Sequence, residues 1–160
     1  RQMCIRDSYK PIQLQSKYNS IKDRILNEGW PLLSDCKGKI IFILQGNNEE
    51  IYKRMFTSNH TLCMFVYDEP GYPNTAFVLR NNPKNYEEEI QLLTNNYIVR
   101  TRTDAGTIEA RNNDYSFYHA ALKSNAQIIS TDYYKSDLRF SDFKITLDGI
   151  NKSKPYIIRN

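Results

Sequence analysis

Short runs rich in β-branched and aromatic residues alternate with helix-like segments along this chain. Strands are expected at residues 39–45, 63–67, 97–104 and 126–132, with a shorter extended piece at 76–80. The first two runs, KIIFILQ and CMFVY, are almost wholly apolar, which is typical of strands buried on both faces. Strands that alternate with helices indicate βα units and a parallel sheet, so the expected fold class is α/β.

The expected helices carry start and stop signals. The first begins at Ser20, which pairs with Asp23 in a capping-box-like start, and it ends at Gly29. Its expected apolar face is Ile21, Ile25 and Leu26. Further helices are expected at 48–56, from Pro83 onward and within 107–124, with a last strand or extended tail at 143–147. The acidic run at 87–89 is expected to lie on a solvated helix face.

Two architectures fit this alternation. The chain has neither GxGxxG nor a Walker A sequence, so a nucleotide-binding doubly wound sheet loses its main signal. A closed eight-stranded barrel needs about 250 residues, and four strands are half of one. The pattern fits half of a (β/α) barrel. An open four-stranded α/β sheet remains the alternative.

Charge and hydropathy argue against a nucleic-acid partner and against a transmembrane segment. The chain has 160 residues and a net charge of +4, and its basic residues are scattered. Nucleic-acid binders usually carry a dense basic patch, so no nucleic-acid partner is expected. The longest strongly apolar run is 40–44, whereas a membrane span needs about 20 apolar residues. No transmembrane segment is therefore expected.

The three cysteines do not indicate a metal site. Cys4, Cys36 and Cys63 are far apart in the sequence and form no CxxC pair, so zinc is unsupported. Cys36 and Cys63 either pair in an oxidising compartment or remain buried free thiols. Glycosylation sequons at Asn59 and Asn151 give weak support for secretion.

The segment YIVRTRTD at 97–104 holds the main candidate site. Side chains alternate along a strand, so Arg100, Arg102 and Asp104 share one face. Arginine binds phosphate well because its planar fork donates two parallel hydrogen bonds. In α/β barrels, active-site groups lie at the carboxyl ends of strands, where Arg102 and Asp104 fall. The alternative is a structural Arg–Asp network.

A second candidate segment, Ser130-Thr131-Asp132-Tyr133, also ends a strand. Asp132 is expected to orient Arg100 or Arg102, and Tyr133 to line a pocket. The turn at 80–83 either reaches a pocket mouth or simply enters a helix.

Histidines and clustered carboxylates are scarce. His60 falls in a loop and His119 in the middle of a helix, and neither follows a strand. Acid–base cleavage of a phosphodiester favours histidine, so no catalytic residue is assigned. No carboxylate cluster has calcium-ligand spacing, so no metal-binding residue is assigned either.

Several segments resemble a known family, in order. They are GWPLLSDCKGKIIFILQ (29–45), AFVLRNNP (76–83), YIVRTRTDAGTIEARNND (97–114) and AALKSNAQIISTDYY (120–134). Over residues 20–148 the chain resembles the C-terminal half of the calcium-dependent phosphoinositide phospholipase C family, whose members are TIM-barrel phosphodiesterases. By this resemblance, the expected fold is a partial TIM (β/α) barrel, roughly the last four strand–helix units. Residues 10–150 are then the C-terminal half of the barrel, and 151–160 are a tail. Residues 1–9 contain MCIRDS, which resembles translated sequencing adapter, and are expected to be a non-native or disordered leader that replaces the true N-terminal part.

The resemblance implies a phosphoric diester hydrolase acting on inositol phospholipids at a membrane surface, in a secreted or extracellular protein. It implies two catalytic histidines and Ca²⁺ in the full-length parent, both held by the family's N-terminal half. The chain alone is therefore expected to be inactive. Arg102, Asp104, Ser130 and Asp132 match family motif positions, and Arg100 matches one nearby; all five are expected to contact the phosphate or headgroup.

Two other functions remain open. One is a non-catalytic α/β module that binds an anionic ligand through Arg100 and Arg102. The other is a sibling phosphodiesterase that cleaves glycerophosphodiesters or sphingomyelin.

Overall fold

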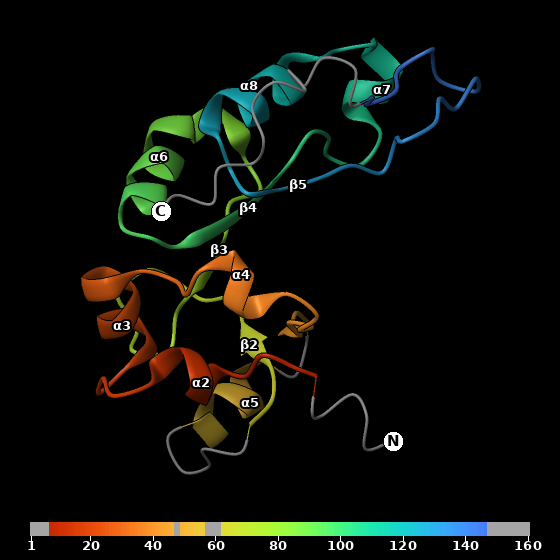
Figure 1. Cartoon of the computed structure of the whole chain (residues 1–160). Coiled ribbons are helices and arrows are strands. Elements are labelled where there is room, and N and C mark those ends of the chain that lie inside the picture. Colours follow the sequence, from red (N-terminus) through yellow and green to blue (C-terminus); the bar gives the residue numbers. More distant parts are fainter. Residues whose placement is uncertain (1–6, 47–48, 57–61, 147–160) are drawn as a thin grey trace. The chain divides into compact units, whose positions relative to one another are not determined.

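The chain forms two compact units in a computed structural model that describes residues 7–46, 49–56 and 62–146 (Figure 1). The first unit comprises residues 1–78 and 95–97, and the second comprises residues 79–94 and 98–160. Both contain helices and parallel strands, so the α/β class is confirmed. No helix in the described ranges is long and apolar enough to cross a membrane.

The first unit places its strands among short helices. Its elements are α2 (Pro11–Gln15), α3 (Ile21–Glu28), α4 (Leu33–Cys36), β1 (Ile43–Leu44), α5 (Glu49–Phe56) and β2 (Phe65–Val66). As predicted, α3 begins at Ser20, whose Oγ accepts a hydrogen bond of 3.0 Å from the Asp23 N–H, and ends at Gly29. Ile21 and Ile25 are fully buried, but Leu26 is 44% exposed and does not belong to the apolar face.

The prediction of a strand buried on both faces at 39–45 is wrong. Only Ile43–Leu44 forms a strand, paired in parallel with β2, and the preceding Ile40, Ile41 and Phe42 are exposed. A strand is buried on both faces only where layers cover both sides of its sheet. The first unit, as described, provides no such cover for this run.

The core of the first unit is aromatic. Trp30, Phe65 and Phe77 pack against one another with ring centroids 5.2–6.1 Å apart. Trp30 also donates a hydrogen bond of 2.8 Å from its indole nitrogen to the carbonyl oxygen of Asn96. Phe65 is 1% exposed, so its ring holds the strand expected at 63–67 against this core.

Residues 7–9 and the two described cysteines lie in this unit. Ser8 bridges in parallel to Ile40, and the Tyr9 N–H donates to the Ile40 carbonyl oxygen at 2.8 Å. That the whole leader 1–9 is non-native or disordered stays a prediction, and residues 1–6 lie outside the described ranges. Cys36 and Cys63 are half-buried and form no disulfide.

The second unit is built on the strand predicted at 97–104. Its elements are η1 (Pro83–Asn85), α6 (Tyr86–Thr94), β4 (Ile98–Arg102), α7 (Ile108–Asn112), α8 (Ser116–Ser124) and β5 (Ile128–Ser130). The three-stranded sheet has the order β3-β4-β5, where β3 (Phe77–Leu79) is the expected short extended piece. β4 and β5 are parallel, with Arg100 opposite Ile128 and Arg102 opposite Ser130.

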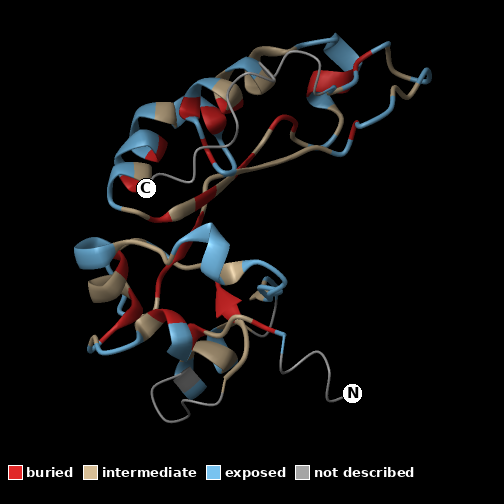
Figure 2. Ribbon diagram, in the orientation of Figure 1, coloured by how far each residue is buried: buried red, intermediate tan, exposed pale blue. Residues whose placement is uncertain are grey.

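Helices α6 and α8 pack against each other and against β4 (Figure 1). Val99, Thr101 and Thr103 of β4 and its extension are fully buried, whereas Arg100 and Arg102 are only partly buried. Figure 2 accordingly shows both buried and partly buried stretches along β4. The predicted alternation along this strand is confirmed. One face of β4 therefore packs into the core, and the other carries both arginines.

The prediction that Glu87, Glu88 and Glu89 all lie on a solvated face is wrong. Glu87 and Glu88 are exposed, but Glu89 is 0% exposed. Successive helical residues are rotated by about 100°, so three in a row cannot share one face. The third carboxyl group is consequently turned into the core.

A small aromatic cluster closes the second unit. The predicted helical region 107–124 divides into α7 and α8, because Asn113 takes a left-handed conformation with φ of 49°. Phe143 is 1% exposed and packs on Tyr133 and Tyr115, with ring centroids 5.5 and 4.7 Å away. The segment expected at 143–147 is an extended tail as far as it is described, and the Ile145 N–H donates to the Tyr133 carbonyl oxygen.

Candidate anion-binding site

Arg100 and Arg102 lie together on the partly exposed face of β4. Arg100 donates from Nη2 to Ser130 Oγ at 2.7 Å and from Nη1 to Asn81 Oδ1 at 3.4 Å. Arg102 donates from Nε to the Asn81 carbonyl oxygen at 3.1 Å. All three acceptors are neutral oxygens.

Neither arginine forms an ion pair with a carboxylate of the described chain, so the alternative of a structural Arg–Asp network is not formed there. A guanidinium has five N–H donors, and both groups keep donors beyond those used. Two positive charges on one sheet face, bonded only to neutral groups, form a suitable cradle for an anion.

Asp104 contacts neither arginine. It is 3% exposed, and its Oδ2 accepts from the hydroxyls of Thr103 and Thr131 at 2.6 and 2.7 Å. Its Oδ1 accepts from the Asp132 N–H at 3.2 Å. The carboxylate thus ties the segment after β4 to the segment after β5, at the carboxyl ends of both strands.

The other predicted site residues separate into two groups. Ser130 belongs to the arginine cluster, since it accepts from Arg100 and donates to the Thr101 carbonyl oxygen. Asp132 has an exposed side chain, and its hydrogen bond to Asp104 is made by its backbone N–H. Tyr133 is buried, and its hydroxyl donates to the Gly106 carbonyl oxygen. Of the five predicted residues, the structure brings together Arg100, Arg102 and Ser130, and separately Asp104 and the Asp132 backbone.

Asn81 and Thr131 complete the two clusters and were not predicted as site residues. Asn81 joins both arginines, while its neighbour Asn82 caps η1 by accepting from the Lys84 N–H. The polar turn at 80–83 therefore serves both as helix entry and as site wall. The sequence signal for Thr131 was its position between Ser130 and Asp132.

The described residues do not fit a Ca²⁺ ion. They contain no group of three or more His, Cys, Asp or Glu side chains that could hold a metal. Asp104 already uses both oxygens for hydrogen bonds. His119 is exposed on α8, and His60 lies outside the described residues.

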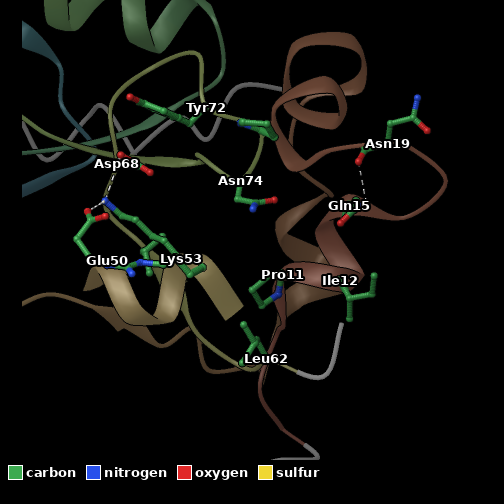
Figure 3. A pocket seen from close by; sticks show the side chains of 13 residues that line it. Pro11, Ile12, Gln15, Asn19, Glu50, Lys53, Leu62, Asp68, Tyr72 and Asn74 are labelled. Carbon is green, nitrogen blue, oxygen red and sulfur yellow. Dashed lines mark hydrogen bonds and ion pairs between the residues drawn. The ribbon is translucent and has the colours of Figure 1, made fainter. Parts of the chain in front are cut away.

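The first unit contains a hollow of about 670 Å³ beside α2, α5 and the loop after β2 (Figure 3). Lys53 borders it, and its ammonium group contacts both Glu50 Oε1 and Asp68 Oδ1 at 3.2 Å (Figure 3). Because this cation already has two carboxylate partners, it offers no uncompensated charge to an anion. None of the predicted site residues lines the hollow.

Comparison with known proteins gives one match. The family model described as "Phosphoinositide phospholipase C, Ca2+-dependent" matches residues 5–155. No curated protein and no solved structure matches the chain.

Proposed function

The chain belongs to the family of Ca²⁺-dependent phosphoinositide phospholipases C, and from this premise we propose that it supplies the phosphate-binding part of a phosphoinositide phosphodiesterase. The observation that carries the proposal is the pairing of Arg100 and Arg102 on one sheet face, bonded only to neutral oxygens. The headgroup phosphate of an inositol phospholipid is an anion that two guanidinium groups bind well.

We propose that the strands form part of a (β/α) barrel. In the described chain, the pairings join strands in sequence order: β1 with β2, the residue after β2 with β3, then β3-β4-β5. A barrel keeps its strands in sequence order, whereas a doubly wound sheet reverses its order at a switch point. The exposed run Ile40–Phe42 is then the surface that further strands of the barrel cover.

The catalytic histidines and the Ca²⁺ ligands, in this proposal, come from a part of the protein outside this sequence. Arg100, Arg102 and Ser130 hold the substrate phosphate, while Asp104 keeps the ends of β4 and β5 together. The family match favours an inositol phospholipid over glycerophosphodiesters or sphingomyelin. A substrate of this kind lies at a membrane surface, and we propose a secreted or extracellular protein.

Hydrolysis assays test this proposal. Phosphatidylinositol in vesicles is offered with Ca²⁺ to the 160-residue chain and to a longer protein that includes the upstream coding sequence. We expect phosphorylated inositol to be released only by the longer protein, and Arg102→Gln to lower its kcat/KM by at least tenfold. An inactive longer protein, or full activity with Arg102→Gln, would contradict the proposal.

A second function has one observation in its favour. In the described residues, His119 is exposed on a helix and no group of three or more His, Cys, Asp or Glu side chains could hold a metal. A non-catalytic module that binds an anion through Arg100 and Arg102 needs neither. Stable anion binding by a cooperatively folded monomer of 160 residues, with no hydrolysis by the longer protein, would favour this module.

A further inference from the structure

Glu89 is a fully buried carboxyl group that the proposed site does not use. It lies in α6, is 0% exposed, and faces β4 and α8. Its Oε2 has no hydrogen-bond partner in the described residues. An ionised carboxylate at such a position is strongly unfavourable unless donors or a cation compensate it.

The hydroxyls beside Glu89 each have a backbone carbonyl oxygen as a nearby acceptor for their single proton. Thr101 Oγ1 lies 3.3 Å from Glu89 Oε1, but it donates to the Arg80 carbonyl oxygen at the shorter distance of 2.7 Å. Ser124, also beside the carboxyl group, donates its hydroxyl proton to the Ala121 carbonyl oxygen at 2.8 Å. A hydroxyl has one proton but two acceptor lone pairs, so both groups suit a donor better than a carboxylate.

We propose that Glu89 is a neutral hydrogen-bond donor in the core, and that its ionisation loosens β4, the strand that carries Arg100 and Arg102. The neutral carboxyl donates its proton to Thr101, which stands between the two arginines in the strand. Ionisation removes this donor. It leaves a buried negative charge on Glu89 beside two hydroxyls that already donate to backbone carbonyl oxygens. This effect of Glu89 ionisation on β4 does not depend on which anion the arginines bind.

Two charged groups near Glu89 act in opposite directions. Burial is the largest influence on the pKa of Glu89 and raises it. Hydrogen bonding to Ser124 and Thr101 lowers this pKa, Arg80 lowers it too, and Glu88 raises it, with a net rise. Arg80 is itself paired with Glu88, with Nε and Oε1 2.8 Å apart, and this pairing weakens the effect of Arg80 on the pKa of Glu89. The neighbouring groups on β4 and α8, Thr101 and Ser124, are uncharged. Burial therefore dominates the balance.

A pH series of urea unfolding on the full 160-residue chain tests the proposal, with Glu89→Gln as the main variant. Glutamine keeps a donor at this position and cannot titrate. The unfolded glutamate loses its proton near its ordinary pKa of 4.5 while the folded one retains it, so wild-type stability falls as pH rises above 4.5. We expect the unfolding equilibrium constant of wild type to rise relative to Glu89→Gln by up to tenfold per pH unit until Glu89 ionises.

Glu87→Gln is the matched control, because it makes the same change on the exposed face of α6. Its pH profile should run parallel to that of wild type. Amide exchange gives a second measurement: the Thr103 N–H, which donates to the Ser130 carbonyl oxygen at 3.0 Å, should lose protection with rising pH in wild type but not in Glu89→Gln. Parallel profiles for wild type and Glu89→Gln in both measurements would overturn the proposal.

Discussion

Arg100 reaches past its own partner on the neighbouring strand to Ser130, two residues further along. The register places Arg100 opposite Ile128, yet its Nη2 lies 2.7 Å from Ser130 Oγ. The guanidinium is thus directed toward the carboxyl ends of β4 and β5, where Arg102 stands opposite Ser130. Both arginines consequently lie toward the carboxyl ends of the strands, which is where α/β proteins bind their ligands.

Ser130 should tune anion affinity through Arg100. Ser130→Ala removes the acceptor that orients this guanidinium, a hydrogen bond to a charged group worth about 1.5–3 kcal/mol. We expect affinity for inorganic phosphate, measured by isothermal titration calorimetry, to fall about tenfold. Ser136→Ala, in the loop after β5, serves as control. Equal affinity of the two variants would remove Ser130 from the site.

The two aspartates of the predicted site should differ in their effect on stability. Asp104→Asn replaces an oxygen acceptor by an NH₂ group facing the hydroxyls of Thr103 and Thr131, and we expect a loss of about 1–3 kcal/mol. Asp132→Asn changes an exposed side chain and should stay within about 0.5 kcal/mol of wild type. Urea unfolding measures both; similar losses would show that the Asp104 contacts do not stabilise the fold.

The exposed run before β1 should cause self-association. The side chains of Ile40, Ile41 and Phe42 are 39–48% exposed and adjacent in sequence, and an exposed apolar patch of this kind favours contact with other chains. We expect the wild-type chain to elute from size-exclusion chromatography as concentration-dependent oligomers, and Ile41→Glu to shift it toward monomer. Leu26→Glu, at an exposed position of α3, is the control. A wild-type monomer at every concentration would rule out this surface as a half-barrel edge.

The loop after β5 contains a local acid–base pair. Arg139 donates to both carboxylate oxygens of Asp137 and holds its pKa at about 2. Because the pKa is lowered on folding, the ionised carboxylate of Asp137 stabilises the folded state. This stabilisation is fully present above pH 3.8 and is lost as the pH falls through about 2. Arg139→Gln should return the Asp137 midpoint, followed by NMR, toward 3.8. An unchanged midpoint would show that the ion pair does not form in solution.

Sequence reasoning was accurate where local periodicity decides the structure. Alternation along 97–104 predicted that both arginines share a face, and the Ser20 and Gly29 signals predicted the bounds of α3. It failed where the outcome depends on neighbouring layers. The apolar run at Ile40–Phe42 has the composition of a covered strand but lacks the cover in the described chain. Glu89 is buried because α8 and β4 pack against its side of α6.

For the candidate site too, local periodicity predicted some residues, whereas others depend on how the strands align. Periodicity indicated Arg100 and Arg102, but their partner Asn81 lies 19 residues before Arg100 and becomes a neighbour only when β3 aligns beside β4. Asp104 looked like an arginine partner by alternation. The strand ends before it, however, so its side chain follows the loop geometry and contacts Thr131 instead.

The central claim is that Arg100 and Arg102 bind the phosphate of an inositol phospholipid headgroup. Its most direct test is calorimetric titration of the 160-residue chain with myo-inositol 1-phosphate, beside Arg102→Gln and the charge-matched control Arg139→Gln. We expect Arg102→Gln to weaken binding by about 10- to 100-fold, and the control to bind like wild type, because a charge-assisted hydrogen bond contributes about 1.5–3 kcal/mol. Equal affinity of wild type and Arg102→Gln, or equal weakening by both variants, would contradict the claim.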